Sequence, residues 1–420
     1  KAVQNDGRPT LIIGKTTIGF GSPNKGGKSC SHGEPLGEEE VELTKKNLGW
    51  TEPPFTVPAE VSAMLDARVK ELEADAAAWN AQYAEFLKTA DSALIDSLLK
   101  KTVPDNLLEE LLAAAPVDKP VASRASSGTI LQKAAQLVPA LVGGAADLAP
   151  STKSDIKNEG GFSADNRAGR NLHFGIRELE MGMAANGMAL FGGAIPYSST
   201  FAVFSDYMKP AIRLACIQEL HEIYIFTHDS FYVGEDGPTH EPVEQLTMLR
   251  TIPGMTVYRP AEAHEVAHCW NAALRANGPV ALLLTRQNLN PFTAEQAAKI
   301  DVSKGAYVLS DDADFELILT ASGSEVQLAL DAADALRKQG RKVRVVSMPS
   351  LDVFLRQDAA FIESILPNAC RKRVSIEAGA TQIWRTVIGL DGLAIGLDHF
   401  GASAPYKKLV EEFGFTVDSV

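Results

Sequence analysis

Residues 140–151 read ALVGGAADLAPS, and this stretch decides the expected fold class. A short apolar run of this kind is consistent with a buried strand, and the glycines after it allow the backbone to approach a ligand closely. In open α/β sheets, ligands bind in the loops that follow the carboxyl ends of parallel strands. We therefore interpret residues 140–151 as a strand and a ligand-binding loop of an α/β domain.

Strands and helices continue to alternate beyond this loop. Apolar runs at 223–226 and 280–284 belong to the same series, and runs at 317–319 and 343–347 enclose a helical pattern at 324–339. Such alternation predicts the fold class α/β, with consecutive domains that each hold a mainly parallel sheet flanked by helices.

The segment before residue 122 has a different pattern. Apolar positions recur at three- and four-residue steps between 59 and 88, which predicts a long amphipathic helix. Residues 10–13 have the composition of a strand, and prolines interrupt the short helices expected at 91–121. We expect four segments, with the linker as the second: 1–90, 91–121, 122–295 and 301–420.

Composition excludes several kinds of partner. The 420 residues suggest two or three domains, at roughly 100–200 residues each. Acidic residues outnumber basic ones by 53 to 40, and no long run of Lys and Arg occurs, so we expect no nucleic-acid partner. No apolar stretch is long enough to span a membrane. Four widely spaced cysteines favour a reducing compartment, the cytoplasm or a plastid stroma.

Two short patterns point to other enzymes, and we reject both. His264–His268 fits the HExxH template of zinc proteases, but no obvious third ligand follows, and a histidine pair on the exposed side of a covering helix is the better interpretation. Residues 22–29 resemble a Walker loop, but Ser replaces the leading Gly and Pro23 removes a main-chain donor. We assign no metal ligand in this chain.

Polar and aromatic residues gather around the expected strand ends. Glu178 stands in the first turn of a helix, His228 follows a strand, and Phe201, Phe204 and Tyr207 are spaced for one helical face. Each alone has a structural explanation, such as a core stripe, a helix-dipole partner or a solvated histidine. Their combination predicts one site at the edge of a sheet.

Four motifs resemble, in order, the signatures of the transketolase family: KTTIGFGSPNK at 15–25, GGAADLAPS at 143–151, HFGIRE at 173–178 and GEDGPTH at 234–240. The resemblance implies a thiamine-diphosphate-binding fold followed by a transketolase C-terminal domain. Residues 1–90 would be the remnant of the diphosphate-binding domain, 122–295 the pyrimidine-binding domain and 301–420 the C-terminal domain. The family's Gly-Asp-Gly diphosphate signature is absent, so we expect the chain to lack most of its N-terminal domain.

The resemblance also implies an activity. Transketolases transfer a two-carbon ketol unit from a ketose phosphate, such as xylulose 5-phosphate, to an aldose phosphate, such as ribose 5-phosphate, through a thiamine diphosphate adduct. The pentose phosphate pathway and the Calvin cycle use this reaction. Mg²⁺ or Ca²⁺ would bind to ligands on the missing segment, and a homodimer would form the active site between its subunits. We expect the isolated chain to be inactive without that segment.

Individual roles follow by residue from the same resemblance. The residues implied in catalysis are Glu178, which would hydrogen-bond the pyrimidine, and the imidazoles of His240 and His32. The residues implied in cofactor binding are Asp147, Leu148, Glu178, Phe201, Phe204 and Tyr207. The residues implied in substrate binding are His32, Arg124, Ser151, His228, Asp236, His240 and Arg286.

This sequence departs from the family pattern at Leu179-Glu180 and at Glu241, where an aromatic residue with Gly and a Gln are more familiar. Related activities stay open. Dihydroxyacetone synthase and deoxyxylulose-phosphate synthase share the fold and cofactor, although the full phosphate-binding set favours transketolase. The chain could also be a non-catalytic fragment, or a partner subunit that needs a separate diphosphate-binding chain.

Overall fold

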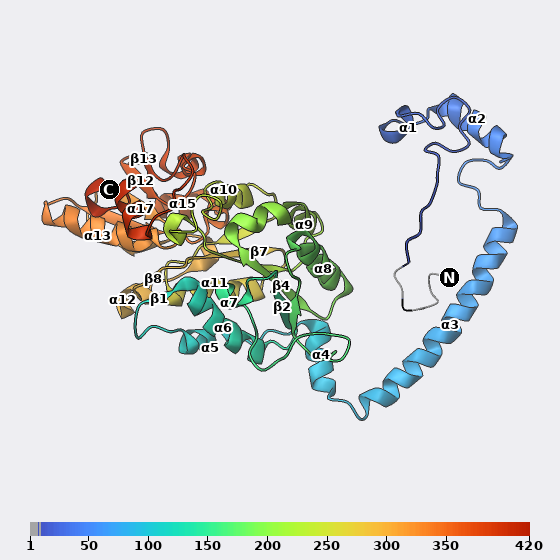
Figure 1. Cartoon of the computed structure of the whole chain (residues 1–420), viewed down its shortest axis with the longest axis horizontal. Helices are drawn as coiled ribbons and strands as arrows, with labels where there is room; N and C mark the ends of the chain where they lie inside the picture. The colour runs from blue at the N-terminus through green and yellow to red at the C-terminus, as the bar shows by residue number, and fades with distance from the viewer. Residues whose placement is uncertain (1–6, 8–9) are drawn as a thin grey trace. The chain divides into compact units, whose positions relative to one another are not determined.

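The structure, a computed structural model, describes residue 7 and residues 10–420, and the chain divides into two compact units after Ala90 (Figure 1). The first unit holds α1 (Cys30–Gly33), α2 (Glu38–Leu48) and α3 (Ala59–Leu87). The 29 residues of α3 confirm the long helix predicted from periodicity. The strand predicted at 10–13 is wrong: these residues are exposed, and no described segment pairs with their main chain, which a strand requires.

The carboxylate of Glu40 binds the loop that resembles a Walker motif. Glu40 accepts hydrogen bonds from the Ser22 hydroxyl and from both the side chain and the main-chain N–H of Asn24, the last at 2.8 Å. These bonds lower the pKa of Glu40 to about 2. A carboxylate in this position would repel a phosphate, which agrees with the rejection of a nucleotide site.

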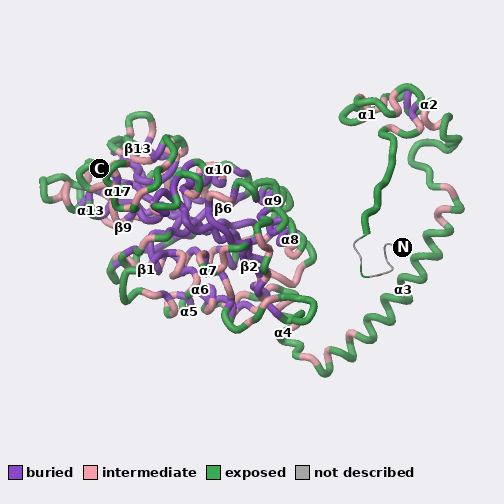
Figure 2. Tube along the Cα trace, in the orientation of Figure 1, coloured by how far each residue is buried: buried purple, intermediate pink, exposed green. Residues whose placement is uncertain are grey.

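A six-stranded sheet forms the centre of the second unit. Its strands lie in the order β3 (Asn171–His173), β2 (Leu141–Ala145), β4 (Ile195–Phe201), β5 (Ile223–Thr227), β7 (Val280–Leu284) and β6 (Thr256–Tyr258). Every pairing between these strands is parallel, which confirms the α/β prediction. Figure 2 shows the buried residues concentrated within this unit.

Helices cover both faces of this sheet. Along β5, Ile223 and Ile225 belong to one core with α5 (Leu107–Ala114), α6 (Ser123–Leu137) and α11 (Ala263–Leu274). Tyr224 and Phe226 belong to the other core, with α8 (Glu178–Phe191), α9 (Ser205–Ile217) and α10 (Gln245–Arg250). The alternation follows from the period of two in a strand.

The sequence did not predict β4, because a proline and three consecutive hydroxyl residues interrupt the apolar residues of its segment IPYSSTF. All seven residues are nevertheless buried. The hydroxyl of Ser198 donates to Glu222 at 2.8 Å, and that of Ser199 donates to the Ile225 carbonyl at 3.0 Å. Hydrogen bonds to the neighbouring strand region offset the cost of burying these hydroxyls. Burial raises the pKa of Glu222 to about 8.

A second sheet follows, in the order β13 (Leu393–Ile395), β12 (Arg373–Ile376), β10 (Leu317–Ala321), β11 (Val343–Ser347) and β9 (Tyr307–Ser310), with only β9 antiparallel. The helix predicted at 324–339 is α13 (Glu325–Lys338). The remaining elements are α4 (Ser92–Lys100), β1 (Val121–Ala122), α7 (Ala149–Thr152), η1 (Ala202–Phe204), η2 (Phe231–Val233), β8 (Asn288–Leu289), α12 (Ala294–Ala297), η3 (Val302–Lys304), α14 (Leu351–Leu355), α15 (Ala359–Ile365), η4 (Gln382–Trp384), α16 (Arg385–Ile388), α17 (Tyr406–Glu412) and η5 (Val417–Ser419).

Buried polar groups join the two sheet domains. The HExxH glutamate, Glu265, is fully buried and accepts hydrogen bonds from Tyr307, Ser347 and the main-chain N–H of Ala261 at 2.5–2.6 Å. Burial raises its pKa to about 7. Both histidines of this motif are half-buried rather than exposed. Across the described part of the chain, no group of three His, Cys, Asp or Glu side chains is placed to hold a metal ion.

The described residues include no helix with the length and apolar character needed to cross a membrane. The four cysteines, Cys30, Cys216, Cys269 and Cys370, are free thiols.

Candidate active site

Four neighbouring parallel strands bring the predicted residues of the second unit to one edge of the sheet. Leu148 follows β2, Phe201 ends β4, His228 follows β5 and Arg286 follows β7. Because these strands are adjacent and parallel, their carboxyl ends meet at the same edge. The fold therefore collects side chains that lie up to 138 residues apart in sequence, from Leu148 to Arg286.

An aromatic pocket of about 490 Å³ lies at this edge. It is lined by Asp147, Leu148, Ile176, Glu178, Phe201, Phe204, Tyr207 and His240. The three aromatic residues do not share one helix, as we predicted: Phe201 ends β4, Phe204 lies in the 3₁₀ turn η1 and Tyr207 lies in α9. All three side chains still line the same pocket, and the Phe204 ring neighbours both others, with its centroid 6.1 Å from that of Tyr207. Ring centroids are 6.0 Å apart for Phe201 and Phe204.

Glu178 is the first residue of α8 and is 8% exposed. The start of a helix carries unpaired main-chain N–H groups and a partial positive charge, which favour a carboxylate there. No side chain or main-chain group in the described part of the chain donates a hydrogen bond to its carboxylate. Glu178 is therefore a buried acid in the aromatic pocket whose oxygens are left for a ligand.

His228 is a buried, neutral imidazole beside a guanidinium group. Arg124 Nη1 lies 3.4 Å from His228 Nε2, and the Thr227 hydroxyl lies 2.8 Å from His228 Nδ1. Since a guanidinium only donates, Nε2 accepts and the ring proton is assigned to Nδ1, which donates to Thr227. Burial, followed by the charges of Arg124 and Arg286, lowers the pKa of His228 to about 3.

A cationic pocket of about 360 Å³ lies beside His228. It is lined by Arg124, Tyr232, Arg286, Gln287, Asn288 and Tyr406. Arg124 Nη1 donates to the Ser151 carbonyl at 2.6 Å, and Arg286 Nη1 donates to the Val233 carbonyl at 2.7 Å. Neither guanidinium forms an ion pair with a described carboxylate. Burial and the neighbouring charge of Arg286 lower the pKa of Arg124, so the pocket favours an anion.

His228 connects the aromatic and cationic pockets by contacting a residue of each, although it lines neither. The His228 and Phe201 ring centroids are 3.6 Å apart, and His228 also contacts Arg124. On the aromatic side, the His240 ring lies edge-on to Phe204 at 5.7 Å, and Thr239 holds His240 Nδ1 at 2.9 Å. A chain of side-chain contacts therefore runs from Phe201 of the aromatic pocket through His228 to Arg124 of the cationic pocket.

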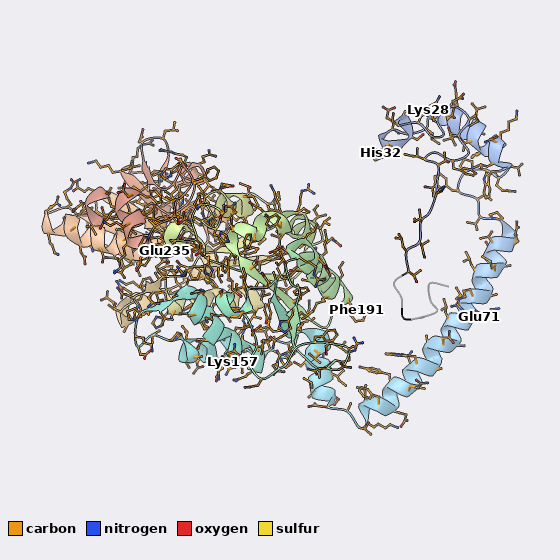
Figure 3. The ribbon with its side chains drawn as sticks, in the orientation of Figure 1. Lys28, His32, Glu71, Lys157, Phe191 and Glu235 are labelled. Carbon is orange, nitrogen blue, oxygen red and sulfur yellow. The ribbon has the colours of Figure 1, made fainter. Side chains whose placement is uncertain are left out.

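Not every predicted residue takes part in these contacts. Asp147 is exposed at the edge of the aromatic pocket, and Asp236 is exposed in the loop 234–240 and lines neither pocket. Ser151 contacts Arg124 through its carbonyl rather than its side chain. His32 is an exposed residue of α1 in the first unit, and its role remains a prediction (Figure 3). The sequence missed Ile176 in the aromatic pocket and four residues of the cationic pocket, of which Tyr406 comes from the C-terminal domain.

The two departures from the family pattern have different settings. Glu180 is exposed, lies 3.4 Å from Arg177 and does not line the aromatic pocket. Glu241 is 2% exposed, and a side chain at Gly401 would collide with its carboxylate. Burial, with a smaller effect of Asp236, raises the pKa of Glu241 to about 7.

Three family models match consecutive parts of the chain. The transketolase thiamine diphosphate binding domain matches residues 1–104, the transketolase pyrimidine binding domain matches 119–291, and the transketolase-like C-terminal domain matches 305–416. The first match contradicts our expectation that the chain lacks most of the diphosphate-binding domain. The expected inactivity, and the expected metal ligands on a missing segment, lose their basis with it.

Curated relatives match almost the whole chain. A transketolase of Halalkalibacterium halodurans is 50% identical over 99% of this chain and 63% of its own length. A transketolase of Bacillus subtilis is 47% identical over 100% of this chain and 64% of its own. The chain thus spans a little under two thirds of the length of these relatives.

Solved structures that resemble this chain are also transketolases. A transketolase from Leishmania mexicana has a TM-score of 0.89 and 36% identity, over 99% of this chain and 61% of that one. A split gene transketolase, described as an inactive beta4 tetramer, has a TM-score of 0.58 and 25% identity, over 71% of this chain and 95% of that one. With matching domains in the same order and half of its residues identical to those of a curated relative, this chain belongs to the transketolase family.

Proposed function

We propose that this chain works in a transketolase, which transfers a two-carbon ketol unit from a ketose phosphate to an aldose phosphate with thiamine diphosphate and a divalent metal ion. The observation that supports this most is that His228 contacts both pockets, through Phe201 on one side and Arg124 on the other. An aromatic pocket with a buried carboxylate adjoins a pocket with two guanidinium groups. A planar cofactor and a phosphorylated substrate would therefore meet there.

The aromatic pocket fits the pyrimidine end of thiamine diphosphate. Phe201, Phe204 and Tyr207 offer ring faces and edges to a planar heterocycle, and Leu148 offers an apolar contact. Glu178 would share a proton between its carboxyl oxygen and a ring nitrogen. When bound, thiamine diphosphate supplies the electron sink for cleaving the bond next to a ketose carbonyl.

The cationic pocket fits the phosphate of a sugar. A phosphate monoester carries nearly two negative charges at neutral pH, and guanidinium groups bind its oxygens in pairs. Arg124 and Arg286 would bind these oxygens, with His228 and Ser151 beside them. Nearer the aromatic pocket, His240 would exchange protons with the substrate, and Asp236 would accept a bond from a sugar hydroxyl.

The quaternary structure belongs to the same proposal. We infer that two copies associate and complete each site between them, as the resemblance to the transketolase family implies. Light scattering of the protein that contains this chain should give the mass of a dimer. A monomer at micromolar concentration would contradict this inference.

An assay of two-carbon transfer tests the function directly. With xylulose 5-phosphate and ribose 5-phosphate, the protein that contains this chain should form a seven-carbon and a three-carbon sugar phosphate. The reaction should stop when thiamine diphosphate and Mg²⁺ are removed, and it should resume when both are returned. Transfer to formaldehyde but not to ribose 5-phosphate would instead indicate a dihydroxyacetone synthase.

One comparison favours a second candidate, a subunit of a two-chain transketolase. The split gene transketolase that resembles this chain is described as inactive as a beta4 tetramer. If this chain works in the same way, it should transfer the two-carbon unit only after a separate partner chain is added. Transfer by this chain alone, at an unchanged rate after that addition, would contradict the second candidate.

A further inference from the structure

The C-terminal domain supplies one wall of the cationic pocket. Tyr406, the first residue of α17, lines that pocket together with Arg124 and Arg286, although 120 residues separate it from Arg286. Its ring centroid lies 6.1 Å from that of Tyr232. Within the described residues, no hydrogen bond occupies the Tyr406 hydroxyl, so this phenol is available to a ligand.

The segment before Tyr406 is docked against the loop that carries Asp236 and His240. The Ser403 hydroxyl donates to the Glu235 carbonyl at 2.6 Å, and Glu235 is labelled in Figure 3. Gly234 has a φ of +88°, and a side chain there would press at 3.3 Å on the main chain of residues 404 and 406. The buried carboxylate of Glu241 packs against Gly401.

The helix that begins at Tyr406 is anchored as well. Leu409 is 2% exposed, and α17 packs against η2. The Phe413 ring, just after α17, lies edge-on to Phe231 of η2 at 5.3 Å. Because both sides of Tyr406 are fixed to the pyrimidine-binding domain, its place in the pocket does not depend on a free loop.

We propose that Tyr406 donates its phenolic hydrogen to the terminal phosphate of the sugar substrate, so that the C-terminal domain forms part of the substrate site. This inference rests on the proposed function, which places the phosphate between Arg124 and Arg286. A phenol at neutral pH donates one hydrogen bond without adding charge. It therefore complements two guanidinium groups whose mutual repulsion a third cation would increase.

Binding of ribose 5-phosphate tests the role of Tyr406 without relying on turnover. In Tyr406→Phe the ring remains and only the hydroxyl is lost, so the dissociation constant of ribose 5-phosphate should rise roughly threefold to tenfold. The dissociation constant of thiamine diphosphate, measured on the same variant with Mg²⁺, should stay unchanged, because the aromatic pocket does not include Tyr406. Isothermal titration calorimetry gives both values.

Arg286→Leu separates this inference from the proposed function. It should weaken ribose 5-phosphate binding by more than tenfold, since it removes one of the two positive charges that would bind the phosphate. If Arg286→Leu has this effect and Tyr406→Phe binds like the wild type, the role proposed for Tyr406 is wrong, but the cationic pocket is still the phosphate site. If Arg286→Leu also binds normally, both are wrong. Equal losses of sugar phosphate and cofactor affinity in Tyr406→Phe would indicate a structural disturbance and overturn the proposal.

Discussion

Replacing Glu178 by Gln should lower the turnover of two-carbon transfer by about 10²- to 10⁴-fold, the range typical of losing a group that transfers a proton. The amide keeps nearly the same shape, but it cannot hold the proton that the carboxyl group would share with the pyrimidine. The folded state should keep its stability, because no described residue donates a hydrogen bond to this carboxylate. Steady-state rates and a thermal unfolding curve of the variant measure both effects.

Glu180→Gln is the matched control, since it makes the same change two residues later in the same turn of α8. Glu180 is exposed and, among the described residues, pairs with Arg177 alone, so its loss should change turnover less than twofold. Near-normal turnover in Glu178→Gln, or an equal loss in both variants, would contradict the role given to Glu178.

Arg259→Met should lower the free energy of unfolding by about 3–5 kcal/mol, the cost typical of breaking a buried ion pair. Arg259 is fully buried, and its guanidinium donates to Asp229 at 2.8 Å and to Glu325 at 2.5 Å. Burial alone would lower the pKa of Arg259. The nearby carboxylates of Asp229, Glu325 and Glu377 have the larger opposite effect, so the pKa is raised overall. Methionine would leave two buried carboxylates without their cation. Denaturant unfolding measures the loss.

This ion pair also connects the C-terminal domain to the strand end that carries His228, the neighbour of Arg124. Glu325 belongs to α13, whereas Asp229 directly follows His228. We therefore expect Arg259→Met to weaken ribose 5-phosphate binding as well. The control is Arg341→Met, because the pair of Arg341 with Glu316 is 42% and 44% exposed and should contribute less than about 1 kcal/mol. Equal stability of the two variants would contradict this account of Arg259.

The sequence predicted most of the second unit because its signals are local. The apolar runs at 223–226 and 280–284 correspond to β5 and β7, and the polar residues that follow these strands lie at one edge of the sheet. That arrangement follows from parallel pairing alone. A strand whose apolar residues are interrupted by a proline and a run of hydroxyl residues gives no such signal, and β4 was missed for this reason.

The rest depends on contacts that no local pattern encodes. The spacing of Phe201, Phe204 and Tyr207 predicted one helix, whereas a strand end, a 3₁₀ turn and a helix start bring the three rings to the same pocket. Tyr406 reaches the cationic pocket because the C-terminal domain docks on the loop 234–240, and nothing near Tyr406 in the sequence indicates this. Apolar character at residues 10–13 predicted a strand, but a strand also needs a partner.

A crystal structure of the protein with thiamine diphosphate, Mg²⁺ and xylulose 5-phosphate would test the central claim most directly. The account predicts that the pyrimidine lies between Phe201, Phe204 and Tyr207, with a ring nitrogen within hydrogen-bonding distance of the Glu178 carboxylate. It also predicts that the sugar phosphate lies between Arg124 and Arg286. Density for the pyrimidine outside the aromatic pocket, or for the phosphate away from both guanidinium groups, would contradict the account.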